Sequence, residues 1–123
     1  PQLLRHEKYH LKIERLPPIK TSLRASNHPY LNGAWTPLHE EVNASDLDVI
    51  EGKIPADIDG VYLRNTENQI HQPLGRFHPF DGDGMVHQIS FRDGRADYRN
   101  RFVRTKCFAA EQEDEQYRKY VGH

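Results

Sequence analysis

The dipeptide Asp93-Gly94 constrains the fold of this chain more than any other feature, because two runs of alternating residues flank it. The favoured two-residue hairpin turn needs a positive φ at both central positions, and Asp and Gly accept that conformation. Before the turn, apolar side chains alternate with mostly polar ones from Met85 to Arg92 at the two-residue period of a strand. Residues 95–105 form the expected return strand. The centre of the chain is therefore predicted to be antiparallel β-structure.

Two further β-segments are expected upstream of this hairpin. Residues 61–65, VYLRN, combine β-branched and aromatic residues after a glycine and predict a strand. The apolar residues at 47, 49 and 50 form a short β-prone run, and residues 52–60 close it with a turn. The chain is thus expected to contribute several short strands to one sheet.

The two ends give weaker patterns. Residues 3–16 fit a poor helix and an irregular arm equally well. Prolines and glycine in residues 17–41 predict an extended, wrapping segment, for which Tyr30 and Trp35 are the expected anchors. The polar stretch 111–119 is the remaining helical candidate, although it carries almost no apolar stripe.

Composition narrows the classes of function. The 123 residues include 17 basic and 18 acidic residues, and this balance does not favour a nucleic-acid partner. The single cysteine, Cys107, excludes an internal disulfide and a Cys-rich zinc module, and it fits a reduced, cytoplasmic setting. No apolar run approaches the roughly 20 residues that span a bilayer. The hydrophobic content of 36% predicts a thin core, and we expect a truncated piece of a larger fold that begins at Pro1 and stops at His123.

Residues 78–87, HPFDGDGMVH, are the strongest candidate for a site of chemistry. A metal site would draw on His71, His78 and His87, but their spacing matches no compact ligand motif. A calcium loop counted from Asp81 would place Met85 and Arg92 where oxygen ligands are needed. A phosphate loop would need a lysine and a further glycine. The better interpretation is a tight turn with left-handed backbone that delivers the chain into a strand.

Three segments, taken in order, resemble the N-terminal part of the carotenoid cleavage oxygenases. They are NHPYLNGAWTPLHEE, GKIPADIDGVYLRNTEN and HPFDGDGMVHQISFRDGRADYRNRFVRT, and the resemblance extends over about residues 28–105. That family includes carotenoid and apocarotenoid dioxygenases, lignostilbene dioxygenases and the retinoid isomerohydrolase. The family usually carries Arg-Asn-Gly-Pro-Asn after the first strand, whereas this chain carries Thr66 and Glu67 in place of Gly and Pro.

The resemblance implies an all-β fold: an N-terminal arm at residues 1–27, about one blade of a seven-bladed β-propeller, and a polar tail at 106–123. It also implies that the parent protein is a dioxygenase. Fe(II), held by four histidines, would activate O2 to cleave a C=C bond of a carotenoid, apocarotenoid or stilbene into two carbonyl products. Membrane attachment of the parent is left open.

No residue of this chain is assigned to catalysis, to a cofactor or to the metal. The family's iron-binding histidines belong to later motifs, so none of the eight histidines here is expected to bind iron: His6, His10, His28, His39, His71, His78, His87 and His123. The fragment is therefore expected to be inactive and unstable without its parent. The alternative is a non-catalytic module that binds an apolar ligand or pairs with a sheet edge.

Overall fold

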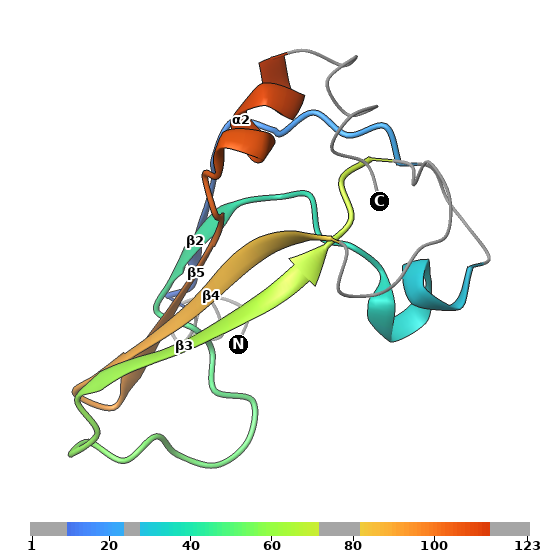
Figure 1. The fold of residues 1–123 in the computed structure, drawn as a ribbon. Coiled ribbons are helices and arrows are strands. Elements are labelled where there is room, and N and C mark those ends of the chain that lie inside the picture. The colour runs from blue at the N-terminus through green and yellow to red at the C-terminus, as the bar shows by residue number, and fades with distance from the viewer. Residues whose placement is uncertain (1–9, 24–27, 72–81, 114–123) are drawn as a thin grey trace.

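A five-stranded antiparallel sheet forms the body of the computed structural model, which describes residues 10–23, 28–71 and 82–113 (Figure 1). Across the sheet the strands run in the order β1-β2-β5-β4-β3. Their bounds are β1 Lys12–Arg15, β2 Val42–Ser45, β3 Gly60–Asn68, β4 Asp83–Arg92 and β5 Arg95–Phe102. Two short 3-10 helices, η1 Pro29–Leu31 and η2 Gly33–Trp35, and the helix α2, Lys106–Glu113, complete the described elements. The expected all-β class is confirmed, with one helix added.

The β4–β5 hairpin forms as the sequence predicts. Asp93 and Gly94 have φ values of 52° and 74°, and Arg92 pairs with Arg95 across the turn. The return strand ends at Phe102, three residues earlier than expected. The N–H of Val103 still donates to the carbonyl of Gly84 on β4, but the N–H of Thr105 then donates to the carbonyl of Val103, and this tight turn leads the chain out of the sheet. Strand β3 is longer than expected, since its polar end continues to pair as far as Asn68↔Asp83.

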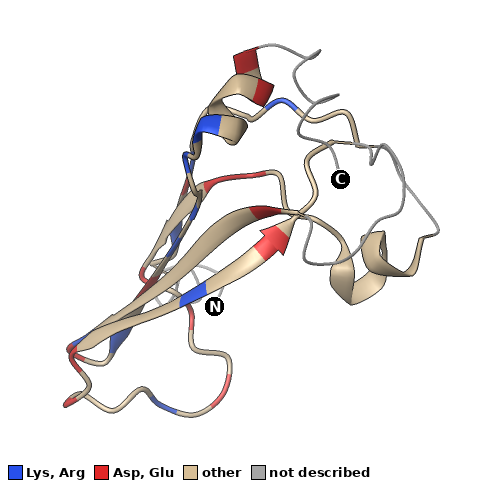
Figure 2. Cartoon of the chain, in the orientation of Figure 1, with Lys and Arg blue, Asp and Glu red and all other residues tan. Residues whose placement is uncertain are grey.

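The register gives the sheet two unlike faces. One face carries a row of apolar and aromatic side chains on the three long strands: Tyr62, Met85, Ile89, Phe91, Ala96, Tyr98 and Phe102. The opposite face is more polar and includes Arg99 and Arg101. Basic and acidic residues are interspersed along the described chain (Figure 2).

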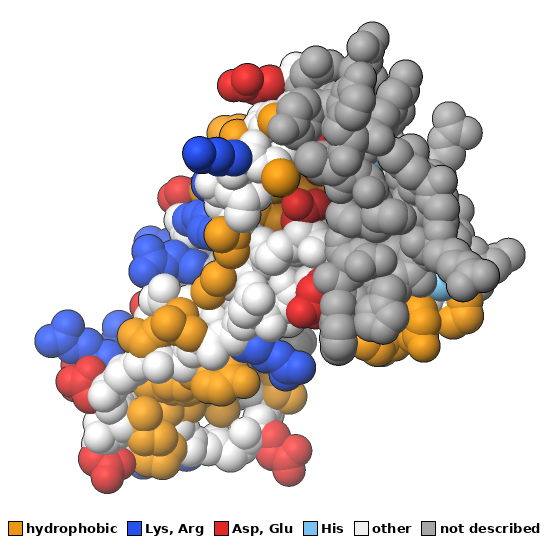
Figure 3. All heavy atoms as spheres, in the orientation of Figure 1, with side chains coloured by type: hydrophobic (Ala, Val, Ile, Leu, Met, Phe, Trp, Pro, Cys, Tyr) orange, Lys and Arg blue, Asp and Glu red, His pale blue; other side chains and the backbone are white. Residues whose placement is uncertain are grey.

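The core lies at one end of the apolar face. There Ile70, Met85, Phe102 and Phe108 are buried in one cluster, with Ile19 packed against it. Helix α2 covers this end, whereas apolar side chains gather uncovered toward the other end of the sheet (Figures 1 and 3). The exposed apolar residues of β3 are Tyr62 on the apolar face and Val61 and Leu63 on the opposite face. The small core expected from composition therefore lies at one end of the apolar face of the sheet.

Several local expectations are wrong. Within the arm, residues 12–15 form β1 rather than a helix or an irregular segment, since they pair with β2. Tyr30 and Trp35 are exposed and contact each other edge-on, while Leu31 is the buried residue of η1. The strand expected at 47–50 lies instead at Val42–Ser45, and Ile50 is 99% exposed. The N–H of Leu47 donates to the carbonyl of Ala96 on β5 at 2.8 Å, but the described residues 47–50 do not continue into a strand.

Helix α2 begins five residues before the expected stretch 111–119, of which 114–119 lie outside the described residues. The hydroxyl of Thr105 accepts a hydrogen bond from the N–H of Phe108 at 3.0 Å, which is the usual geometry of a helix N-cap. Phe108 and Glu111 are the buried residues of the helix. Across residues 10–23, 28–71 and 82–113, no helix is long and apolar enough to span a membrane.

Candidate functional site

The structure does not gather the candidate histidines into a metal site. His71 follows β3, His87 lies in the middle of β4, and His78 lies outside the described residues. Within the part of the chain that the structure describes, no group of three or more His, Cys, Asp or Glu residues could hold a metal ion. His71 and His87 each bond instead to a nearby hydroxyl group, that of Ser22 and that of Thr66 respectively.

His87 is the centre of a polar chain that crosses three strands on the apolar face. Its Nε2 lies 2.7 Å from the hydroxyl of Thr66 on β3, and its Nδ1 lies 2.7 Å from the hydroxyl of Tyr98 on β5. Both ring nitrogens are therefore occupied by hydroxyl groups within the sheet. This arrangement orients the imidazole and leaves neither nitrogen available to a ligand without breaking a hydrogen bond.

Burial shifts the pKa values of both ionisable side chains in this hydrogen-bonded series, His87 and Tyr98. It lowers the pKa of His87, and the positive charge of Arg64 lowers that pKa further. Burial also raises the pKa of the Tyr98 hydroxyl, although a hydrogen bond with Asn100 opposes the rise. His87 is consequently neutral at pH 7, where it can donate to one hydroxyl and accept from the other.

The glycines of the DGDG motif are explained by close backbone approach rather than by a left-handed turn. The positive-φ glycines in the described chain are Gly33, Gly52 and Gly94, so the left-handed backbone expected for the motif does not occur at Gly82 or Gly84. The rest of the expected turn, residues 78–81, lies outside the described residues. A Cβ added to Gly82 would lie 2.8 Å from the backbone carbon of Asn68. Asp83 already belongs to β4. The small glycine of the motif lets two backbone segments of the same chain pass closely where β3 ends and β4 begins.

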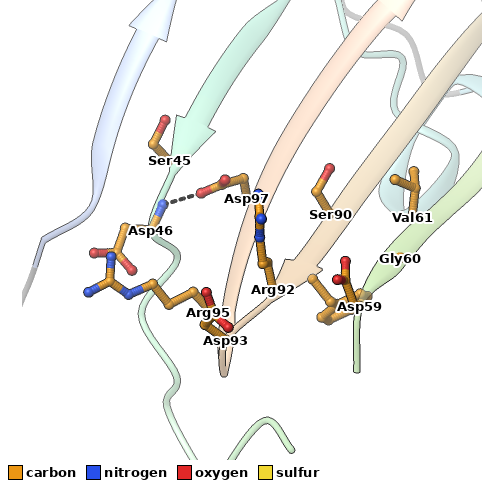
Figure 4. Close-up of a pocket in the computed structure, with 11 residues that line it drawn as sticks. Ser45, Asp46, Asp59, Gly60, Val61, Ser90, Arg92, Asp93, Arg95 and Asp97 are labelled. Carbon is orange, nitrogen blue, oxygen red and sulfur yellow. Dashed lines mark hydrogen bonds between the residues drawn. The ribbon is translucent and has the colours of Figure 1, made fainter. Parts of the chain in front are cut away.

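A surface groove of about 840 Å³ lies at the opposite end of the sheet, beside the β4–β5 turn (Figure 4). Its charged lining comprises Asp46, Asp59, Arg92, Asp93, Arg95 and Asp97. The carboxylate of Asp97 accepts a 2.6 Å hydrogen bond from the backbone N–H of Asp46, which has a φ of 57°. This bond holds the chain at the point where it leaves β2, so Asp97 has a structural role in the groove.

The polar chain around His87 was only partly accessible to sequence reasoning. The Asp93-Gly94 turn fixes the pairing of Ile89 with Tyr98, which places Tyr98 diagonally across from His87. Thr66 gave no comparable signal, because a long connection separates β3 from β4 and leaves their register open.

Comparison with known proteins gives one consistent relationship. A family model described as "Retinal pigment epithelial membrane protein" matches residues 35–123. The chain is 47% identical over 87 residues to a carotenoid cleavage oxygenase of Mycobacterium tuberculosis, an alignment covering 69% of this chain and 17% of that protein. It is 42% identical over 86 residues to an isoeugenol monooxygenase of Pseudomonas nitroreducens, covering 69% of this chain and 18% of the relative.

A solved structure has the same fold over this region. The lignostilbene dioxygenase of Pseudomonas brassicacearum superposes with a TM-score of 0.68 and 32% sequence identity, covering 75% of this chain and 19% of that one. The chain thus spans less than a fifth of the length of these relatives.

Proposed function

This chain belongs to the carotenoid cleavage oxygenase family, and from that premise we propose that it is the N-terminal segment of a non-haem Fe(II)-dependent dioxygenase. The proposed reaction inserts both atoms of O2 across a C=C bond, so that each of the two carbonyl products carries one of them. The substrate would be a carotenoid, an apocarotenoid or a stilbene-type compound. The observation that carries the proposal is the family match over residues 35–123.

The part proposed for this segment is structural. Val61 and Leu63 on β3 are 57% and 61% exposed, and among the described strands β3 pairs with β4 alone. An apolar strand at an open sheet edge is typical of a surface that another part of a protein covers. This supports a sheet that belongs to a larger propeller, with 1–27 as its arm.

The described residues do not fit the iron centre. The hydrogen bonds of His87 and the lack of a metal-binding cluster in residues 10–23, 28–71 and 82–113 support a centre built from other parts of the polypeptide. Among these described residues we therefore assign no iron ligand and no catalytic residue. When bound, Fe(II) would supply the activation of O2.

The test is cleavage by the natural-length protein loaded with Fe(II). An apocarotenoid, a hydroxystilbene and isoeugenol serve as probes, with carbonyl products identified by mass spectrometry under ¹⁸O2. We expect two carbonyl products from at least one probe, each containing one ¹⁸O atom. Failure to cleave all three probes by a protein that contains stoichiometric iron would overturn the proposal.

The alternative is a non-catalytic module that binds an apolar ligand or a sheet edge, and the exposed apolar side chains at β3 favour it. Unfolding of residues 1–123 expressed separately distinguishes the two. A cooperative transition would favour the module, whereas a propeller segment with an open edge should melt without one.

A further inference from the structure

Three segments far apart in the sequence meet beside the core, and we name them together the arm seam: Lys20–Ser22, Gln69–His71 and Phe108–Gln112. The N–H of Ser22 donates to the carbonyl of Ile70 at 3.2 Å. The backbone N–H of Lys20 donates to Gln112 Oε1 at 2.8 Å, and Gln112 Nε2 donates back to the carbonyl of Lys20 at 3.0 Å. The arm is therefore fastened both to the loop after β3 and to helix α2.

Two buried ionisable side chains lie inside the arm seam. His71 Nε2 and Glu111 Oε2 are 3.7 Å apart, and the side chains are only 9% and 6% exposed. His71 Nδ1 lies 3.0 Å from the hydroxyl of Ser22. The imidazole of His71 thus joins the arm on one side to the carboxyl group of the helix on the other.

The other charges that the structure describes around the seam do not favour an ionised carboxyl group at Glu111. Asp83, at the start of β4, acts on it as a like charge. The cation of Arg104 is bound to Glu41 Oε1 at 2.6 Å and lies over the Phe108 ring. The contacts from Lys20 are made by its backbone. The other charged residues of α2, Lys106 and Glu113, are exposed. Within the described residues, His71 is the basic side chain that faces Glu111.

We propose that His71 and Glu111 form a proton-dependent latch, in which one proton shared by the pair keeps the arm docked and its loss releases the arm. With that proton present, the pair is either neutral or a matched ion pair. Without it, a buried carboxylate faces a neutral imidazole and Asp83, a combination that is costly away from water. Because Gln112 follows Glu111 directly, a displacement of α2 breaks both bonds to Lys20.

The direction of the pH effect follows from linkage. Burial, and secondly Asp83, raise the pKa of Glu111 to about 7 from an ordinary value of 4.5. In the open state His71 also keeps a proton up to the ordinary histidine pKa of about 6.5. Counted over the pair, the closed seam therefore binds more protons than the open one only above about pH 6, and rising pH weakens the closed state there. Between pH 6 and pH 8 the opening equilibrium should increase by about 2- to 3-fold.

Hydrogen exchange in the natural-length protein tests the latch. A peptide covering residues 17–23 reports the amides of Lys20 and Ser22, and its protection factors, corrected for intrinsic rates, are measured from pH 5 to pH 8.5. We expect protection to fall about 2- to 3-fold between pH 6 and pH 8.5, while a peptide from the β4–β5 hairpin keeps its protection. This readout is independent of cleavage activity, so the latch and the proposed dioxygenase reaction can fail separately.

Matched substitutions on one helix identify the proton. Glu111→Gln imitates the protonated carboxyl group and should keep the arm protected up to pH 8.5. Glu113→Gln removes the same charge from an exposed position of α2 and should leave the wild-type pH dependence unchanged. Asp83→Asn removes the like charge and should reduce the pH dependence, which gives a second test if Glu111→Gln does not fold.

Two outcomes would overturn the latch. The first is constant protection of residues 17–23 from pH 5 to pH 8.5 in the wild-type protein. The second is a pH dependence that survives both Glu111→Gln and Asp83→Asn unchanged.

Discussion

The Nδ1 atom of His87, in the middle of β4, lies 2.7 Å from the hydroxyl of Tyr98 on the neighbouring strand β5. The two residues are diagonal neighbours, since Tyr98 pairs with Ile89. On the other side, Thr66 occupies Nε2, so one imidazole links three consecutive strands of the sheet. His87, which the sequence offers as a candidate metal ligand, instead forms hydrogen bonds that connect β3, β4 and β5.

Tyr98→Phe should destabilise the natural-length protein by about 1–3 kcal/mol, because it leaves a partly buried ring nitrogen of His87 without its hydroxyl partner. The midpoint of urea unfolding measures the effect. Tyr62→Phe is the matched control: Tyr62 lies on the same face at β3 but is half exposed, so loss of its hydroxyl should change stability by less than about 0.5 kcal/mol. Equal effects of the two substitutions would contradict the structural role of the pair.

Sequence reasoning succeeded where the determinants are local. Asp93 and Gly94 take the positive φ values that a tight hairpin needs, and the turn then fixes the register of both strands. It failed at β1 and β2, because the pairing Ile13↔Ala44 depends on two segments far apart in the chain. The apolar run 47–50 gave a stronger strand signal than β2 itself, yet no neighbouring strand pairs with it in the described sheet.

At the candidate site, too, sequence reasoning found local features and missed those that depend on tertiary contacts. Glu111 reads as one more charge in a polar tail, and its burial depends on where Phe108 places the helix. The glycines of DGDG were recognised as structural, but their cause lies in the backbone of Asn68, fourteen residues before Gly82. Contacts of that kind are set by tertiary packing, which a local pattern cannot specify.

Gly82→Ala should destabilise the protein by about 1–3 kcal/mol, because the new methyl group would meet the backbone of Asn68, which cannot rotate away. Thermal unfolding measures the loss. Gly60→Ala provides the comparison, since a Cβ at Gly60 meets nothing within 4 Å. A Gly82→Ala protein as stable as Gly60→Ala would show that β3 and β4 approach less closely than the structure indicates.

Glu41→Gln should cost about 1–3 kcal/mol at pH 7, and less as the pH falls. Burial would raise the pKa of Glu41, but hydrogen bonds from Arg104 and from the N–H of Phe102 outweigh it and lower that pKa. The ionised carboxyl group therefore contributes stability above its unfolded pKa, and this contribution is lost as pH decreases through the folded pKa.

Urea unfolding at pH 7 and pH 4 measures this difference. Glu40→Gln is the control, because its side chain is 70% exposed and its nearest cation, on Arg15, is 4.0 Å away. That substitution should change stability by less than about 0.5 kcal/mol at either pH. A Glu41→Gln effect of the same size at both pH values would show that the charge of Glu41 is not what stabilises the junction of β2 and β5.

Phe108→Ala tests whether α2 closes the core. The Phe108 ring stacks on Phe102, with centroids 5.3 Å apart and an interplanar angle of 22°, and Phe108 is only 3% exposed. Its removal should leave a cavity beside Ile70 and Met85 and cost about 3–5 kcal/mol in urea unfolding. Cys107→Ala, at the preceding exposed position of the same helix, should be nearly neutral. A Phe108→Ala cost below about 1 kcal/mol would mean that the sheet end is closed by other parts of the protein, and the arm seam would then lose its support as well.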